Sequence, residues 1–127
     1  MNDSVRVLIS DDDPMIRDAL REVLEAQPDL AVVAVTKDAD EAIEHTERLR
    51  PSVAVLDVRM PGGGGIRAAR EIRERSPRTR ILVLSAYDDV GAERELSELG
   101  VVEYLVKGVP NAEIVAAVRR LGDTEPS

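Results

Sequence analysis

Five short apolar runs alternate with five amphipathic stretches along the 127-residue chain, and this alternation restricts the fold more than any other feature. The apolar runs are rich in β-branched residues and have the length of strands, at residues 5–10, 30–36, 53–57, 81–85 and 101–107. Apolar residues with helical spacing follow each run, over about 14–27, 38–49, 66–75, 89–99 and 110–121. Such alternation is typical of a parallel sheet with right-handed crossovers and helices on both faces. We therefore predict one α/β domain with a doubly wound five-stranded sheet and five helices.

Chemically active residues close several of the predicted strands. Asp57 ends the central run, whose four apolar residues indicate a strand buried on both faces. Asp11 and Asp12 follow the first run, Ser85 closes the fourth and Lys107 closes the fifth. If the strands take the flavodoxin-like order 2-1-3-4-5, the carboxyl ends of these four strands share the rim where open α/β folds bind ligands. We therefore expect these five side chains to gather at one place.

Three carboxylates at one rim require a cation, because each close pair repels by about 4 kcal/mol at an effective dielectric of 20. Carboxylate oxygens without thiolates favour a hard divalent ion, and Mg²⁺ commonly shares its ligand shell with a phosphate group. A carboxylate beside such an ion can attack phosphorus, so Asp57 is a candidate to form an aspartyl-phosphate. Lys107 and the ion would neutralise the phosphoryl oxygens, and the Ser85 hydroxyl would donate a hydrogen bond to one of them.

Composition argues against several other functions. Seventeen basic and 25 acidic residues give a net charge of −8, so this domain is not expected to bind nucleic acid directly. The chain has no cysteine and one histidine, which argues against a zinc site. We find no signal-peptide pattern and no apolar run close to the roughly 18 residues of a membrane span. The expected location is the cytoplasm, without membrane contact.

Four separated motifs resemble the receiver domain of two-component response regulators, and the resemblance covers the whole chain. The motifs are Asp11-Asp12, the Leu-Asp-Val-Arg-Met-Pro-Gly segment around Asp57, Ser85-Ala86, and the strand segment from Tyr104 to Lys107. The resemblance implies a CheY-like fold in which Asp57 accepts a phosphoryl group from a sensor histidine kinase. It also implies that the domain catalyses only its own phosphorylation and dephosphorylation.

The same resemblance assigns roles around Asp57. It implies Mg²⁺ binding by Asp12, Asp57 and the backbone carbonyl of Arg59, with Asp11 acting through a bound water. Lys107 would contact the phosphoryl group, Ser85 would move toward it, and Tyr104 would be the aromatic residue that follows inward. The expected output is a change on the face made by the fourth helix, fifth strand and fifth helix, which would control an output domain or a partner protein. Two phosphorylated copies could also pair there, with Arg119 and Arg120 meeting Glu93, Glu95 or Glu98.

Details of the motifs resemble the NarL/FixJ type of regulator more than the OmpR type. The first acids stand in Ser-Asp-Asp-Asp-Pro-Met, and no proline follows Lys107 directly. Regulators of that type usually carry a helix-turn-helix domain after a linker. Residues 1–121 are accordingly predicted to be the receiver domain, and 122–127 a tail or the start of a linker, in a fragment or a single-domain regulator. Glycines fill positions 62–65, which suggests an unusually mobile loop after Asp57.

Two alternative functions belong to other classes. Asp11 and Asp13 have the Asp-x-Asp spacing of haloacid-dehalogenase-like phosphohydrolases, but the later acidic pair is missing and Asp57 would have no role. A receiver fold could instead serve only for docking, without phosphorylation. That alternative leaves the electrostatic cost of the acidic set unexplained.

Some charged residues have simpler interpretations. Asp13 is expected to cap a helix. His45 stands among glutamates on the polar side of the second predicted helix and is expected to be solvated. A series of arginines is expected to form a solvated helix face with i,i+3 charge pairs: Arg67, Arg70, Arg73 and Arg75.

Overall fold

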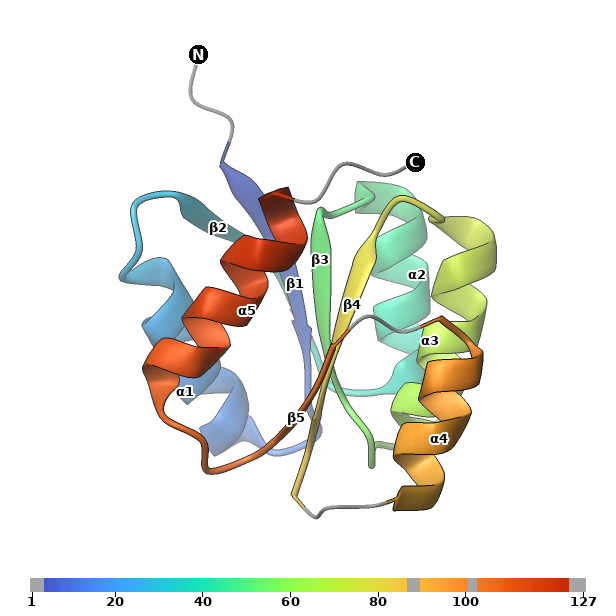
Figure 1. Cartoon of the computed structure of the whole chain (residues 1–127). Helices are drawn as coiled ribbons and strands as arrows, with labels where there is room; N and C mark the ends of the chain where they lie inside the picture. The colour runs from blue at the N-terminus through green and yellow to red at the C-terminus, as the bar shows by residue number, and fades with distance from the viewer. Residues whose placement is uncertain (1–3, 87–89, 101–102, 124–127) are drawn as a thin grey trace.

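The computed structural model describes residues 4–86, 90–100 and 103–123 (Figure 1). The strands are β1 (Val5–Ser10), β2 (Leu30–Thr36), β3 (Val53–Asp57), β4 (Arg80–Ser85) and β5 (Glu103–Val106). The helices are α1 (Pro14–Glu25), α2 (Ala39–Leu49), α3 (Gly64–Arg75), α4 (Val90–Glu98) and α5 (Asn111–Asp123). All four strand pairs are parallel, in the order β2-β1-β3-β4-β5, so the predicted fold class is confirmed.

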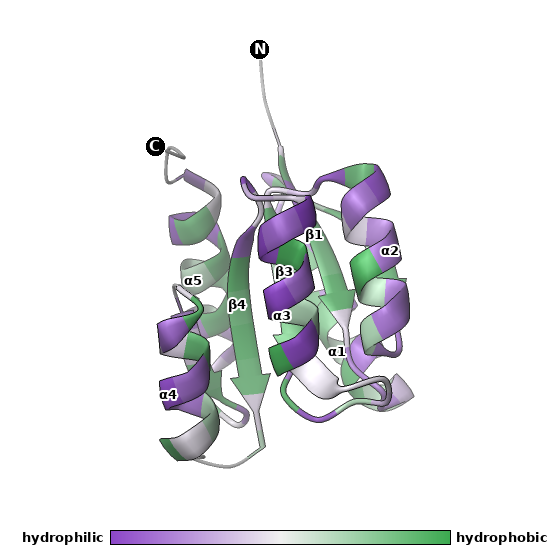
Figure 2. Cartoon of the chain, turned by 90° about the vertical axis from the view of Figure 1, so that its right-hand side faces the viewer, coloured by the Kyte–Doolittle hydropathy of each residue, from purple (hydrophilic) through white to green (hydrophobic). Residues whose placement is uncertain are grey.

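The sheet forms the middle of three layers. Helices α1 and α5 cover one face, and α2, α3 and α4 cover the other (Figure 1). Each interface encloses its own apolar cluster, and all five residues of β3 are buried between the two. Figure 2 shows hydrophobic residues along the strands and hydrophilic residues on the outer sides of the helices. Burial on both faces explains why the central strand has a continuous apolar sequence.

Two helix ends differ from the sequence prediction. Helix α3 begins at Gly64, ahead of the predicted Ile66, because the first turn lies close to the end of β3 and Gly65 N–H donates to the Val58 carbonyl at 2.9 Å. Helix α5 continues to Asp123 instead of ending near Leu121. Gly122 lies against the start of β1, where an added Cβ would be 2.5 Å from Val5 Cγ1. Residues 89, 101 and 102 of the predicted elements lie outside the described residues.

Helix capping and charge pairing follow local rules only in part. Asp13 caps α1, as predicted, and accepts a hydrogen bond from Met15 N–H at 2.9 Å. His45 is half-buried, so it is only partly solvated, and its Nδ1 lies 2.8 Å from the Glu41 carbonyl oxygen. Among the described residues, no helix combines the length and apolar character that a membrane crossing requires.

The arginines of α3 mainly contact neighbouring elements, which corrects the predicted i,i+3 pairing. Arg67 lies 2.7 Å from Asp40 on α2, and Arg70 lies 3.6 Å from Glu95 on α4. Arg75 contacts Glu47 on α2 as well as Glu71 on its own helix. These exposed pairs each contribute less than about 1 kcal/mol, and they connect α3 with α2 and α4 on one face of the sheet.

Candidate functional site

Three carboxylates and one ammonium group meet at the carboxyl ends of the strands. Asp11 follows β1 and Asp57 ends the adjacent β3, while Lys107 follows β5. Oxygen atoms of Asp11, Asp12 and Asp57 lie within 4.8 Å of one another. Lys107 Nζ lies 2.8 Å from Asp11 Oδ2 and 3.2 Å from Asp57 Oδ1. The geometry therefore brings together four of the five rim residues selected from the sequence.

Backbone hydrogen bonds between strand ends fix the positions of these side chains. Asp11 N–H donates to the Thr36 carbonyl at 3.1 Å, and Lys107 N–H donates to the Ser85 carbonyl at 2.6 Å. Asp11 Oδ1 also accepts a hydrogen bond from Asp13 N–H at 3.0 Å. The acids and the lysine are thus placed by the ends of the sheet itself, and such rigid elements suit a site that needs fixed geometry.

The remaining predicted residues surround this group at different depths. Ser85 ends β4 and is buried, one position beyond the Leu84 that pairs with Asp57. Tyr104 is half-buried on β5 and packs against the apolar cluster on the side of α2, α3 and α4. Arg59 is exposed, and its backbone N–H donates a hydrogen bond to the Asp57 carboxylate.

Burial and neighbouring charges perturb two of the titratable groups. Burial raises the pKa of Asp57, the adjacent Asp11 raises it further, and Lys107 only partly offsets the two. Burial alone would lower the pKa of Lys107, but its hydrogen bond to Asp11 and the charges of both acids raise it instead. Lys107 is therefore held as an ammonium, while ionisation of Asp57 in the folded protein costs stability.

This donor set fits a hard divalent cation. The three acids supply only oxygen ligands, and one lysine balances only part of their charge. Asp12 is exposed while Asp11 and Asp57 are buried, so the group opens to solvent on one side. A Mg²⁺ ion bound here could keep water ligands and still reach an incoming phosphate oxygen.

Asp57→Asn is expected to raise the melting temperature at neutral pH without divalent ions. The folded pKa of Asp57 lies above its ordinary value of 3.8, so its stabilising contribution is complete below that value and is lost as pH rises through the folded pKa. Asparagine carries no charge, so the difference from wild type should be largest near pH 7 and should disappear only below about pH 3.8. Thermal unfolding between pH 3 and 8 measures this difference.

Asp29→Asn is a control for which the expected change in melting temperature has the opposite sign. Two hydrogen bonds from Arg119 lower the pKa of Asp29, so its contribution is present above 3.8 and is lost as pH falls through the folded pKa. Its substitution should therefore lower the melting temperature at neutral pH. An unchanged or lower melting temperature for Asp57→Asn at pH 7 would contradict the electrostatic account of the site.

Comparison with known proteins identifies the family. A family model described as "Response regulator receiver domain" matches residues 7–119. The chain belongs to the response regulator receiver family. The predicted resemblance is therefore confirmed over nearly the whole described fold.

Similar proteins include regulators of transcription. The chain is 36% identical over 118 residues to the DNA-binding transcriptional activator DevR/DosR of Mycobacterium tuberculosis, covering 93% of this chain and 54% of that protein. It is 35% identical over 122 residues to the transcriptional regulatory protein LiaR of Bacillus subtilis, covering 96% of this chain and 58% of that protein. The receiver chain thus spans about half the length of the curated relatives it matches.

A solved structure gives the same result for the fold. The signal receiver domain of the putative response regulator NarL from Mycobacterium tuberculosis superposes with a TM-score of 0.92 at 32% identity. The match covers 97% of this chain and 99% of that one. The similarity to NarL-type regulators that the motifs suggested is accordingly confirmed.

For two residues near the receiver site, the structure adds information that the sequence did not provide. Asp13 is engaged in the α1 cap and lies outside the group of acids that could hold a metal, so the Asp11/Asp13 phosphohydrolase alternative loses its pair. Arg17, which the sequence did not single out, donates a hydrogen bond from its guanidinium to the Asp11 carbonyl at 2.9 Å. The only sequence feature that could have indicated this contact is the position of Arg17, one helical turn after Asp13.

Proposed function

We propose that this receiver domain is a cytoplasmic switch in which Asp57 accepts a phosphoryl group from a sensor histidine kinase. The observation that carries the proposal is the contact of one lysine with two buried carboxylates beside a third, exposed one. A group of acids whose charge is only partly balanced is unfavourable for folding, which supports a functional role. A docking module that is never phosphorylated would gain nothing from this group of acids.

In the proposed reaction, each of the residues at the carboxyl ends of the strands has a separate role. Asp12, Asp57 and the Arg59 carbonyl would hold Mg²⁺, with Asp11 acting through a water ligand; when bound, the ion supplies charge neutralisation for phosphoryl transfer. Asp57 would provide the attacking oxygen, and its new bond to phosphorus would form as the bond from phosphorus to the histidine nitrogen of the kinase breaks, with that histidine as the leaving group. Lys107 would turn toward the phosphoryl oxygens, and its existing 3.2 Å contact with Asp57 supports that role.

The proposed output is a shift in the face formed by α4, β5 and α5. The Ser85 hydroxyl would donate a hydrogen bond to a phosphoryl oxygen, and the Tyr104 ring would move further into the space beside α4. The half-buried position of Tyr104 supports this step, because the side chain already packs on the apolar cluster and still has exposed surface that a move inward would bury. The shifted face would control an output domain or partner protein, or pair with a second copy.

Arg119, one of the residues predicted to pair two copies, already has partners within the chain. Its guanidinium contacts Asp29 at 2.8 and 2.9 Å and Gln27 at 2.6 Å, so it links α5 to the connection between α1 and β2. Arg120 lies 2.6 Å from Glu103 on β5. A self-pairing surface on this face would therefore compete with Asp29 and Glu103 for the two arginines.

Incubation with acetyl phosphate and Mg²⁺ is expected to add one phosphoryl group to the chain, at Asp57. Intact mass spectrometry measures the addition, and chelation of Mg²⁺ should abolish it. Asp57→Asn should remain unlabelled, and Asp12→Ala should be labelled at least about tenfold more slowly at the same Mg²⁺ concentration.

Asp13→Ala is the matched control, because it removes an adjacent carboxylate that caps α1 and lies outside the acidic group. It should be labelled at close to the wild-type rate. Labelling that persists in Asp57→Asn, or that proceeds equally well without a divalent ion, would contradict the proposed function.

A further inference from the structure

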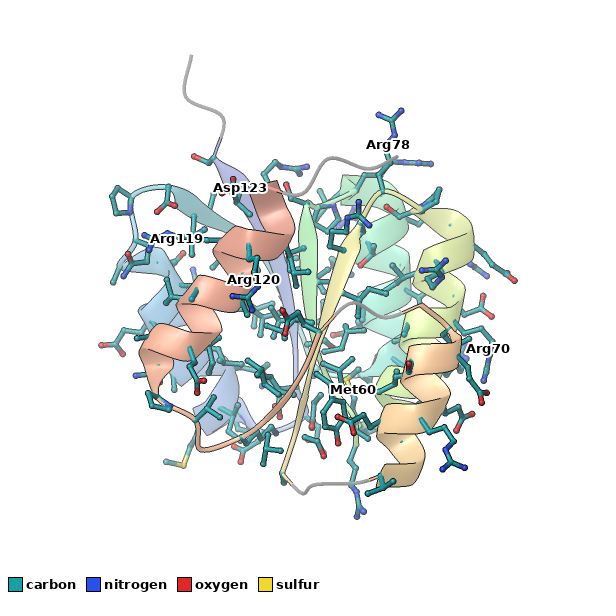
Figure 3. All side chains as sticks on the ribbon, in the orientation of Figure 1. Met60, Arg70, Arg78, Arg119, Arg120 and Asp123 are labelled. Carbon is teal, nitrogen blue, oxygen red and sulfur yellow. The ribbon has the colours of Figure 1, made fainter. Side chains whose placement is uncertain are left out.

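A second charged site lies at the opposite end of the sheet, where the strands begin. A hollow of about 230 Å³ is lined by three arginines from different segments together with four other residues: Arg50, Pro51, Ser52, Arg78, Arg80, Leu121 and Gly122. We call this set the arginine hollow. A neighbouring hollow of about 340 Å³ shares Arg50 and Arg78. Figure 3 shows Arg78 at this end of the molecule, far from the carboxyl ends of the strands.

Hydrogen bonds between strand starts hold the backbone beneath the arginine hollow. Ser52 N–H donates to the Arg6 carbonyl at 2.8 Å, and Arg80 N–H donates to the Ser52 carbonyl at 2.9 Å. The Arg6 guanidinium donates to the carbonyls of Leu49 and Arg50 at 2.9 and 3.3 Å. Arg6 therefore satisfies the carbonyl end of α2 and leaves the Arg50 side chain available for another role.

Among the residues that the structure describes, the arginine hollow has no carboxylate in its lining, although the chain carries a net charge of −8. Within residues 4–86, 90–100 and 103–123, the guanidinium groups of Arg50 and Arg78 make no hydrogen bond or ion pair. Guanidinium groups match the oxygens of phosphates and carboxylates in a two-pronged geometry. Three positive charges suit a phosphate dianion better than a single carboxylate.

The backbone of Arg50 gives a reason to look for a function of its side chain. Arg50 caps α2 with φ of 47°, the single positive value among non-glycine residues in the described part of the chain. Glycine occupies such a cap without the steric cost that a side chain brings. An arginine here therefore costs some stability, and its side chain has no local partner that offsets this cost.

We propose that the arginine hollow binds a phosphate dianion, either free or as the terminal group of a small phosphate monoester. Arg50 and Arg78 contact the phosphate oxygens, and Arg80 adds positive charge at the start of β4. Because Leu121 and Gly122 also line the hollow, the bound group lies against the last turn of α5.

Calorimetric titration of the whole chain with inorganic phosphate, in EDTA and at constant ionic strength, tests the proposal. Without metal, the acids around Asp57 repel phosphate, so the titration reports on other sites. Wild type should bind saturably, and Arg50→Gly and Arg78→Ala should each bind at least about tenfold more weakly. Arg50→Gly should melt at or above the wild-type temperature, which separates lost binding from lost folding.

Arg48→Ala is the matched control, because Arg48 is an exposed arginine of α2 that lies outside the hollow. It removes the same charge two residues away and should keep wild-type affinity. Tighter binding of glycerol phosphate than of inorganic phosphate would indicate that the ligand is a phosphate monoester. The reverse order of affinities would indicate that the ligand is the free ion. Equal affinity in all variants, absence of saturation, or equally tight binding of acetate would overturn the proposal.

Discussion

Lys107→Met is expected to lower the free energy of unfolding by about 3 to 5 kcal/mol in the absence of divalent ions. The ammonium group contacts both Asp11 and Asp57, whose side chains are only 2% and 7% exposed. Methionine retains the apolar stem but removes the charge, so two buried carboxylates would face each other without a cation. At roughly 3 to 5 °C per kcal/mol for a domain of this size, the melting temperature should fall by about 10 to 25 °C.

Lys37→Met is the control for this experiment. Lys37 is exposed and lies 3.9 Å from Glu41, so its substitution should cost less than about 1 kcal/mol. Millimolar Mg²⁺ should restore part of the stability of Lys107→Met, because the ion replaces the missing positive charge. Similar losses in the two variants would mean that Lys107 does not balance the buried acids.

The alternation of strands and helices and the acids that close the strands were predictable because they depend on local sequence, whereas the strand order was assumed by analogy with flavodoxin-like folds. Strand length, helical spacing and the residue that closes each strand can all be read within a short window. Asp57 and Asp11 follow adjacent parallel strands, so their proximity follows from the strand order alone. The tighter contact of Lys107 with Asp11 than with Asp57 could not be predicted, since it depends on side-chain geometry across the sheet.

Contacts between helices were beyond the reach of sequence reasoning for a similar reason. The spacing of Arg67, Arg70 and Arg75 correctly indicated an exposed helix face, but their partners on α2 and α4 are separated from them along the chain. Helical spacing describes one helix at a time and carries no information about its neighbour. The same limit applies to Arg119, whose partner Asp29 lies 90 positions away.

The glycine run after Asp57 was interpreted as a loop without fixed geometry, whereas the structure gives its last two residues a place in α3. Gly65 is buried in the first turn of α3, and an added Cβ would lie 2.5 Å from the Asp57 carbonyl oxygen and 3.1 Å from Val58 Cα. Both neighbours are backbone atoms, so neither can rotate away as a flexible side chain would. Close packing of α3 against the end of β3 therefore requires glycine at this position.

Gly65→Ala is accordingly expected to lower the free energy of unfolding by about 3 kcal/mol, at the upper end of the range for overpacking. Intrinsic helix propensity predicts the opposite, since alanine in an open helix is more stable than glycine by about 1 kcal/mol. The sign of the change therefore distinguishes steric contact from propensity. Because the clash falls on the carbonyl of Asp57, labelling by acetyl phosphate should also slow in this variant.

Gly108→Ala separates this clash from backbone strain. Gly108 has φ of 102° and no atom within 4 Å of an added Cβ, so alanine there meets conformational strain without a collision. Its expected cost is about 1 kcal/mol, and chemical denaturation of both variants measures the difference. If Gly65→Ala were as stable as wild type, α3 would have room to move away from β3. The position of Asp57 would then depend on the sheet alone, without support from the glycines that follow it.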